Sequence, residues 1–138
     1  MNKDKYHQNV REALEKDGWT ITHDPYFLAI GRRRSYIDLG AERTVIAAER
    51  GIDKIAVEVK SFIGSSDLDQ FEDALGQFLL YLVILKEKEP ERLLILAVPS
   101  GFYERFFDDP VFLKIARHYG VNMMIYDVET KTIMQWIK

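Results

Sequence analysis

Glu58 and Lys60 are the residues of this chain whose types and spacing are best suited to chemistry. They stand in IAVEVKS, residues 55–61, a segment that otherwise has the apolar, β-branched character of a buried strand. Side chains of a strand alternate between its two faces, so Glu58 and Lys60 are expected side by side on one face. Buried charges cost free energy unless they are paired, hydrated or bound to a metal ion. The pair therefore predicts a catalytic site, and a salt bridge on an exposed sheet face is the alternative.

Asp38 is the third candidate, because it stands in SYIDLG, where a short apolar segment meets a glycine. The interval between Asp38 and Glu58 is long enough for a turn and one added strand. An Asp and a Glu from neighbouring strands can converge on Mg²⁺ or Mn²⁺, with Lys60 positioning the attacking water or stabilising charge on a phosphorane-like transition state. Glu42 and Glu49 are alternative acids, and Asp38 is preferred. We therefore predict catalytic residues Asp38, Glu58 and Lys60, with the two acids as metal ligands.

The elements that must position these residues are read from hydrophobic periodicity and from turn residues. In the first half we expect a helix, a strand-like stretch broken at Asp24-Pro25, a short strand, and an antiparallel hairpin. These elements span residues 4–17, 19–30, 36–39, and 44–49 with 55–60. In the second half we expect a long helix, a strand buried on both faces, a helical stretch broken at Pro110, and two final strands. They span residues 68–85, 93–98, 100–118, 122–126 and 132–137.

This element order predicts one domain, residues 1–138, with a mixed central sheet flanked by helices. The fold class is α/β, with α+β as the alternative.

The composition is that of a soluble globular protein, with 47% hydrophobic and 30% charged residues. No apolar run reaches the roughly 20 residues that span a bilayer, and cysteine is absent. The N-terminal residues have no apolar signal-peptide core. We therefore expect an intracellular, cytoplasmic protein with no membrane contact.

The charge balance bears on DNA as a partner. A formal net charge of −3 argues against strong nonspecific attraction of DNA to the whole protein, although a local basic patch would change this. The dense basic run is Arg32–Arg34, which follows Gly31. We interpret it as a solvated turn, with a phosphate-contacting loop as the alternative.

The order of Asp38 and Glu58-Val59-Lys60 resembles the PD-(D/E)XK nuclease superfamily, whose acid and Glu-x-Lys lie on an αβββαβ, restriction-endonuclease-like scaffold. The residue before Asp38 is isoleucine where the motif has proline. In the following helix, Gln77 and Tyr81 match the Gln-x-x-x-Tyr pattern of RecB-like members. Four residues apart, they share one helical face. The resemblance implies that they contact DNA phosphates or brace the catalytic strand, and ordinary helix packing is the alternative.

Longer segments extend the resemblance over nearly the whole chain. The segments KDGWTITHDP, YIDLGAE, KIAVEVKSF, ALGQFLLY, EPERLLILAVP and IYD look like those of the XisH family, excision-controlling factors associated with the fdxN DNA element. This resemblance implies a small protein needed for programmed DNA excision. It also implies a second factor of the XisI type and a separate site-specific recombinase as partners.

Three functional hypotheses follow. The first is a Mg²⁺-dependent endodeoxyribonuclease-like site acting in DNA excision. The second is a catalytically inactive regulatory subunit that binds a partner protein or the recombinase. The third is a toxin-like or restriction-like nuclease restrained by its partner.

Several other side chains receive a structural interpretation. His7 and Glu12 are expected to be polar residues on the surface of the first helix, and a position beside the catalytic site is the alternative. Five aromatic residues are expected in the core of the protein or at an interface, including a homodimer interface. They are Trp19, Phe102, Phe106, Phe107 and Trp136.

Overall fold

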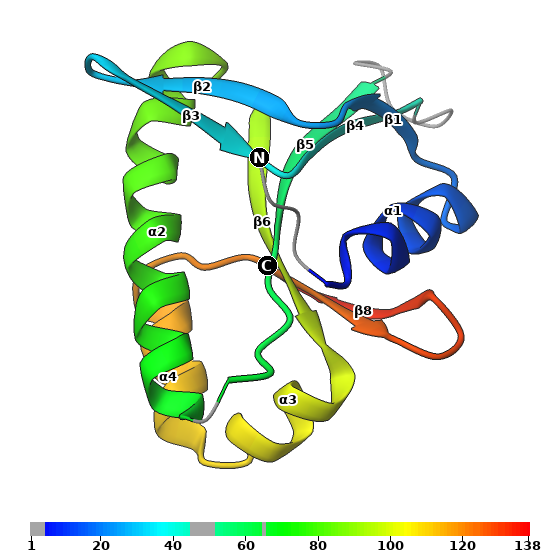
Figure 1. Cartoon of the computed structure of the whole chain (residues 1–138), viewed down its shortest axis with the longest axis vertical. Helices are drawn as coiled ribbons and strands as arrows, with labels where there is room; N and C mark the ends of the chain where they lie inside the picture. Colours follow the sequence, from blue (N-terminus) through cyan, green and yellow to red (C-terminus); the bar gives the residue numbers. More distant parts are fainter. Residues whose placement is uncertain (1–4, 45–51, 65) are drawn as a thin grey trace.

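The structure is a computed structural model that describes residues 5–44, 52–64 and 66–138. Helices cover both faces of a central sheet, and a small hairpin projects from one end (Figure 1). In chain order the elements are α1 (His7–Lys16), β1 (Thr20–His23), β2 (Tyr26–Ile30), β3 (Arg33–Ile37), β4 (Leu39–Thr44), β5 (Ile52–Val59), α2 (Asp67–Lys88), β6 (Arg92–Pro99), α3 (Ser100–Phe106), α4 (Pro110–His118), β7 (Met123–Asp127) and β8 (Thr132–Ile137).

The main sheet has six strands in the order β1-β4-β5-β6-β7-β8. The three central strands β5, β6 and β7 are parallel, and the remaining pairings are antiparallel. Strands β2 and β3 form a separate antiparallel hairpin. The predicted mixed sheet of an α/β protein is therefore confirmed.

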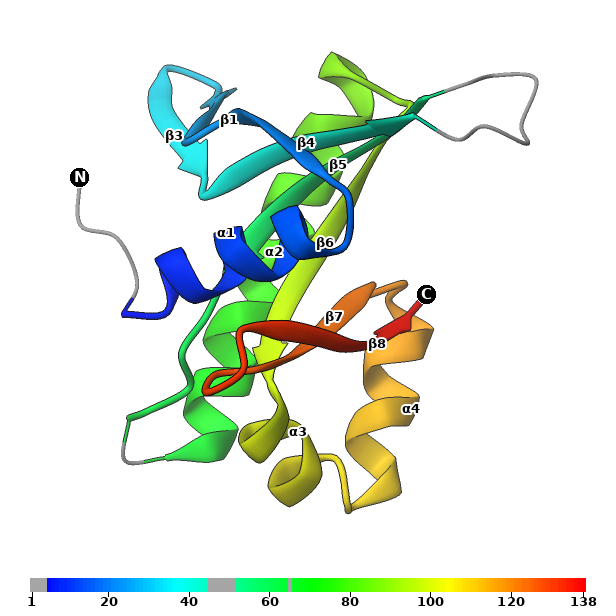
Figure 2. The ribbon, with the colours of Figure 1, turned by 90° about the vertical axis from the view of Figure 1, so that its right-hand side faces the viewer.

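Each face of the sheet has its own hydrophobic core. Helix α1 covers one face, where Val10 and Leu14 pack with strand residues that include Val57 and Val59. Helices α2, α3 and α4 lie on the other face (Figure 2), where Phe78 packs with Ala56 and Leu96. The alternation predicted for residues 55–60 is thus present, with its odd-numbered residues toward α1.

In the first half of the chain, two predicted element boundaries are confirmed, and a third, the start of the strand paired with β5, was wrong. The break at Asp24-Pro25 separates β1, an edge strand of the main sheet, from β2 in the hairpin. Gly18, with φ of +90°, follows α1 as expected of a C-terminal cap. The strand paired with β5 begins at Leu39 and not at Thr44, because the chain bends at Asp38 and enters the main sheet directly afterwards. Residues 45–49 lie outside the described residues.

The second half follows the prediction more closely. Helix α2 extends one turn beyond Leu85, and the Ser66 hydroxyl caps its start by accepting a hydrogen bond from the Asp69 amide. Strand β6 contributes side chains to both cores, and Pro110 begins α4 after a break. The aromatic residues expected in the core or at an interface are buried, except Trp136, which is half-buried. In the described ranges no helix is both long and apolar enough to cross a membrane.

Gly40 and Gly76 make a matched pair for a test of packing. A Cβ added at Gly40 would lie 2.9 Å from His23 Nδ1 and 3.1 Å from Tyr26 Cδ2, whereas one added at Gly76 meets no atom within 4 Å. We expect Gly40→Ala to lower the free energy of unfolding by about 1–3 kcal/mol. Gly76→Ala, in the exposed middle of α2, should raise it by about 0.5–1 kcal/mol. Urea denaturation measures both, and equal effects of the two substitutions would contradict this account of β4 packing.

Candidate functional site

The register between β4 and β5 brings Asp38 and Glu58 together. Leu39 pairs with Val57 across these antiparallel strands, so residues 38 and 58 stand one step further along the same ladder. Asp38 occupies the bend between β3 and β4, where the chain passes from the hairpin to the main sheet. Its position therefore depends on both sheets.

Hydrogen bonds fix the two carboxylates against the end of β5. Asp38 Oδ2 accepts a hydrogen bond of 2.7 Å from the Val59 backbone amide. Glu58 Oε1 accepts a longer one, 3.4 Å, from the Asp38 amide. Lys60 Nζ lies 3.6 Å from Glu58 Oε2. The three residues proposed from the sequence as a catalytic set therefore lie together in the fold.

Glu58 is in an unfavourable environment for a charge. Its side chain is only 8% exposed. Burial raises the pKa of Glu58 to about 8, and the neighbouring Asp38 carboxylate adds to this increase, while Lys60 opposes it. At this site a bound proton compensates for the negative charge, and a bound cation would do the same.

The donor set fits a hydrated magnesium ion better than a metal cage built only from protein ligands. In the part of the chain that the structure describes, no group of three or more His, Asp or Glu side chains is arranged to hold a metal ion. Mg²⁺, however, is commonly held by one or two carboxylates and keeps several water ligands. Asp38 and Glu58 supply two such carboxylates. The same pair would accept Mn²⁺, which also takes oxygen ligands.

The alternative acids do not join this site. Glu42 lies opposite Lys54, toward the start of β5, and its Oε1 is 3.5 Å from Arg92 Nη2. Glu49 lies outside the described residues. Asp38 is therefore the acid that the described fold brings beside Glu58.

His7 is a neighbour of the site that the sequence interpretation assigned to the helix surface, and that assignment was wrong. Its side chain is only 4% exposed. Its Nε2 lies 2.8 Å from Asp24 Oδ1, and Arg11 Nη1 donates to Asp24 Oδ2. Its Nδ1 has no hydrogen-bond partner in the described structure and lies 4.0 Å from Asp38 Oδ1. The spacing of His7 to Val10, one helical turn on the buried face of α1, was the available signal.

Glu12, considered together with His7, points elsewhere. Its Oε2 lies 3.3 Å from Lys131 Nζ, in the turn between β7 and β8. This contact joins α1 to the far edge of the sheet and is consistent with the structural role expected for Glu12.

Gln77 and Tyr81 form a pair on α2 that braces the hairpin. Gln77 Nε2 donates a 2.9 Å hydrogen bond to Tyr81 Oη, and Ser35 Oγ on β3 donates one of 3.2 Å to the same oxygen. Tyr81 is buried. No hydrogen bond or ion pair joins either residue to Asp38, Glu58 or Lys60 within the described residues. Their contact with DNA stays a prediction, and the observed geometry positions β3, the strand that leads to Asp38.

Tyr81→Phe tests this bracing role. The substitution removes the acceptor of two side-chain hydrogen bonds and leaves the amide of Gln77 without its partner. We expect the free energy of unfolding to fall by about 1–3 kcal/mol. The exposed Tyr119→Phe serves as the control and should change stability by less than about 0.5 kcal/mol. Unchanged stability of Tyr81→Phe in urea denaturation would mean that the bonds to Tyr81 do not support the hairpin.

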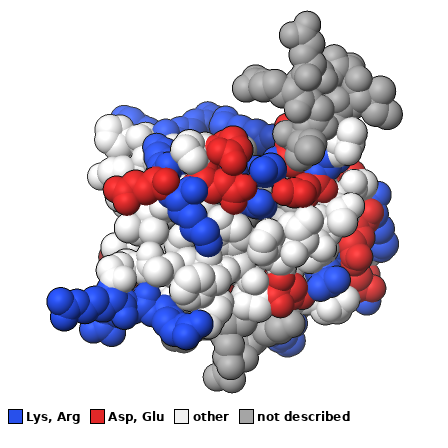
Figure 3. Space-filling view, turned by 90° about the horizontal axis from the view of Figure 1, so that it is seen from above, with Lys and Arg blue, Asp and Glu red and all other residues white. Residues whose placement is uncertain are grey.

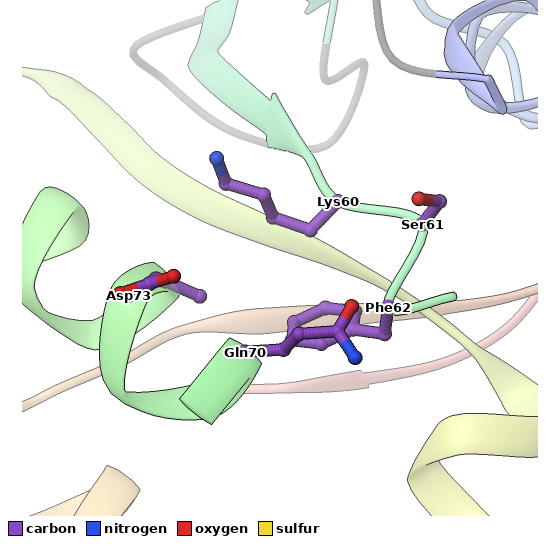
Figure 4. A pocket seen from close by; sticks show the side chains of 6 residues that line it. Lys60, Ser61, Phe62, Gln70 and Asp73 are labelled. Atoms are coloured by element: carbon purple, nitrogen blue, oxygen red, sulfur yellow. The ribbon is translucent and has the colours of Figure 1, made fainter. Parts of the chain in front are cut away.

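A pocket of about 190 Å³ adjoins Lys60. Lys60 and Phe62 reach it from the segment after β5, while Gln70 and Asp73 reach it from the first turns of α2 (Figure 4). Phe62 has φ of +52° and stacks on Phe102, with ring centroids 4.1 Å apart. Lys60 therefore contacts Glu58 through its ammonium group and also lines this pocket.

Comparison with known proteins identifies the family. The family model described as XisH protein matches residues 1–134, a range that includes every candidate site residue. The chain belongs to the XisH family. This confirms the resemblance seen in the sequence. A search of curated proteins finds no match.

Two solved structures share the XisH fold. The crystal structure of an XisH family protein from Nostoc punctiforme has 45% sequence identity and a TM-score of 0.87, and the match covers 98% of this chain and 100% of that one. The structure of an fdxN element excision controlling factor protein from Anabaena variabilis has 42% identity and a TM-score of 0.84, with 96% and 98% covered. At these levels the XisH chain shares the complete fold of both relatives.

Proposed function

We propose that this XisH protein acts in DNA excision or rearrangement as a Mg²⁺-dependent, endonuclease-like phosphodiesterase. The observation that carries the proposal is the convergence of Asp38, Glu58 and Lys60 at one end of β5, with Glu58 buried beside a second carboxylate. Such a carboxylate pair is costly for stability, and cation binding gives a reason for it. The link to excision comes from the relative in Anabaena variabilis, an fdxN element excision controlling factor.

In the proposed reaction, water attacks phosphorus in line, a new P–O bond forms, the ester bond to the leaving oxygen breaks, and the proton that the water loses passes through solvent to the leaving oxygen. Asp38 and Glu58 would hold the divalent ion, which supplies positive charge against the phosphate oxygens. Lys60, 31% exposed and open to its pocket, would donate hydrogen bonds to the oxygens on which negative charge accumulates. The hydrogen bond from Val59 to Asp38 keeps that carboxylate oriented before DNA binds.

A nuclease assay tests the proposal. Purified protein, stripped with a chelator and then given Mg²⁺ or Mn²⁺, is incubated with supercoiled, linear and branched DNA. We expect metal-dependent cleavage that Lys60→Ala reduces by at least about 100-fold. Lys54→Ala, at the opposite end of β5, is the matched control and should retain activity. Absence of cleavage on every substrate, with no divalent ion bound in calorimetry, would refute the catalytic function.

A regulatory subunit without catalysis is the second candidate, and one surface favours it. Leu80 and Val83 on α2 are each 60% exposed, beside an apolar groove that Ile30 also lines. Exposed apolar stripes of this kind are typical of protein interfaces. A partner of the XisI type, a recombinase reached through it, or a second copy in a homodimer would cover the stripe. Under this candidate Leu80→Glu abolishes co-elution with the partner, while Lys60→Ala has no effect on excision.

The restrained nuclease remains the third candidate, in which the same partner would block the site. All three functions belong in the cytoplasm, the compartment in which we propose that the protein meets DNA. Repeating the nuclease assay with the partner added distinguishes the third function from the first. A restrained nuclease would cut DNA when it is purified alone and would stop when the partner is added.

A further inference from the structure

The β2–β3 hairpin has one buried face and one open face. Its register pairs Phe27 with Tyr36 and Ala29 with Arg34. The alternate residues Tyr26, Leu28 and Ile37 are buried in the core shared with α2. Because strand side chains alternate, Phe27, Ala29, Arg34 and Tyr36 share the opposite, open face.

This open face combines aromatic rings with positive charge. Phe27 is 40% exposed, and the Tyr36 ring meets it edge-on at 5.7 Å. Arg34 Cζ lies 5.3 Å and Lys88 Nζ 5.6 Å from the centre of the Phe27 ring. Two cations therefore lie near an exposed ring on a protein whose net charge is −3.

The turn of the hairpin adds further charge without compensation. Arg32, Arg33 and Arg34 are exposed, and none of them forms an ion pair with an acid in the described ranges. Figure 3 shows basic side chains projecting at one corner of the molecule, on the side where Figure 1 has the tip of the hairpin. The remaining charges on that view are mixed in sign.

The hairpin also leads to the proposed site. Tyr36 precedes Asp38 by two residues, so the Cα atoms of the two residues are at most about 7 Å apart. A chain of phosphates lying on the open face, from the arginine turn toward Tyr36, would therefore be directed to the carboxylates. Rings accept stacked bases only where those bases are unpaired, and guanidinium groups bind the phosphates between them.

From this arrangement we infer that the open face of the β2–β3 hairpin binds an unpaired, single-stranded segment of DNA. Phe27 and Tyr36 stack with bases, Arg34 on the same face contacts the phosphates, and Arg32 adds a phosphate contact at the turn. The inference rests on the proposed function for the identity of the site that this strand enters. It adds the class of substrate, DNA with a single-stranded or branched region.

Fluorescence anisotropy with a labelled oligothymidine of about 20 nucleotides tests the inference, with a duplex of the same length as comparison. The buffer contains a chelator, so binding is measured without cleavage. We expect Phe27→Ala to weaken single-strand binding by roughly 5- to 100-fold and to leave duplex binding unchanged. Arg34→Ala should reduce the slope of log affinity against log salt by about 0.7. Phe27→Trp should retain binding, because it preserves the stacking surface.

Matched controls come from α4 and the residue that follows it. Tyr119, 48% exposed, and the exposed Arg117 have the same chemistry away from the hairpin. Tyr119→Ala and Arg117→Ala should therefore leave the affinity and the salt slope unchanged, and thermal melts verify that all variants fold. Three results would each overturn the inference. They are equal affinity of wild type and Phe27→Ala for the single strand, no binding of the single strand at low salt, and an equal loss of affinity in the Tyr119→Ala and Arg117→Ala controls.

The outcomes separate this inference from the catalytic proposal. If oligothymidine binds and depends on Phe27 but no DNA is cut with any metal, the hairpin binds single strands and the catalytic function fails. If DNA is cut and Phe27→Ala changes neither binding nor cleavage, the catalytic function stands and the hairpin inference fails.

Discussion

Glu58→Gln will stabilise the metal-free protein at pH 8 and abolish its binding of divalent cations. The pKa of Glu58 in the folded protein is about 8, above its ordinary value of 4.5. Between these two values the folded state retains a proton that the unfolded state has released, so the free energy of unfolding falls as pH rises from about 4.5 to 8. The neutral amide avoids this loss and still accepts the hydrogen bond from the Asp38 amide. We expect the variant to be more stable than wild type by roughly 2–5 kcal/mol at pH 8 and to differ little at pH 4.

Thermal and urea unfolding between pH 4 and 9, in a chelator and then in Mg²⁺, measures this effect. Added Mg²⁺ should restore the stability of wild type at pH 8 and leave Glu58→Gln unchanged, since binding to the folded state alone stabilises it. The exposed Glu72→Gln on α2 is the control and should follow the pH profile of wild type. A wild-type protein equally stable at pH 5 and pH 8 would contradict the electrostatic account of the carboxylate pair.

Arg92→Ala will destabilise the fold by about 3–5 kcal/mol, because it leaves buried partners unpaired. The Arg92 side chain is only 2% exposed. Its Nε donates to Glu89 Oε1 at 2.7 Å, and its Nη1 donates to the carbonyl oxygens of Ile55 at 2.8 Å and of Ala41 at 3.4 Å. This arginine therefore joins β4, β5 and β6 at the end of the sheet opposite the site.

Arg105→Ala is the matched control. Arg105 makes two hydrogen bonds to Asp67, but its side chain is 56% exposed, so its loss should cost less than about 1 kcal/mol. Urea denaturation compares the two variants, and similar losses would mean that burial does not determine the contribution of Arg92.

The same network predicts acid sensitivity. The hydrogen bond from Arg92 lowers the pKa of Glu89 to about 2, and further interactions with Tyr26 and Lys54 add to this. A lowered pKa contributes stability that is present above pH 4.5 and is lost as pH falls toward 2. In Arg92→Ala this part of the acid unfolding profile should flatten.

Much of the fold could be predicted because its signals are local. Three such signals are the core-facing residues Phe71, Phe78 and Leu85 of α2, the apolar run of β6 and the glycine after α1, and each depends on neighbours within a few residues. The start of β4 was misassigned, because the bend at Asp38 is fixed by a hydrogen bond from Val59, 21 residues away. Local propensity contains no information about such a contact.

For the candidate site, the sequence by itself determined that Glu58 and Lys60 lie on the same side of the chain at the end of β5, since side chains of an extended segment alternate with a period of two. It also determined membership of the XisH family. Only the tertiary structure decided that Asp38, and not Glu42, lies beside Glu58, because the register of β4 on β5 brings them together. The burial of His7 against Asp38 was likewise decided by the docking of α1 on the sheet. Both depend on contacts between segments distant along the chain, where packing and hydrogen bonding select the arrangement.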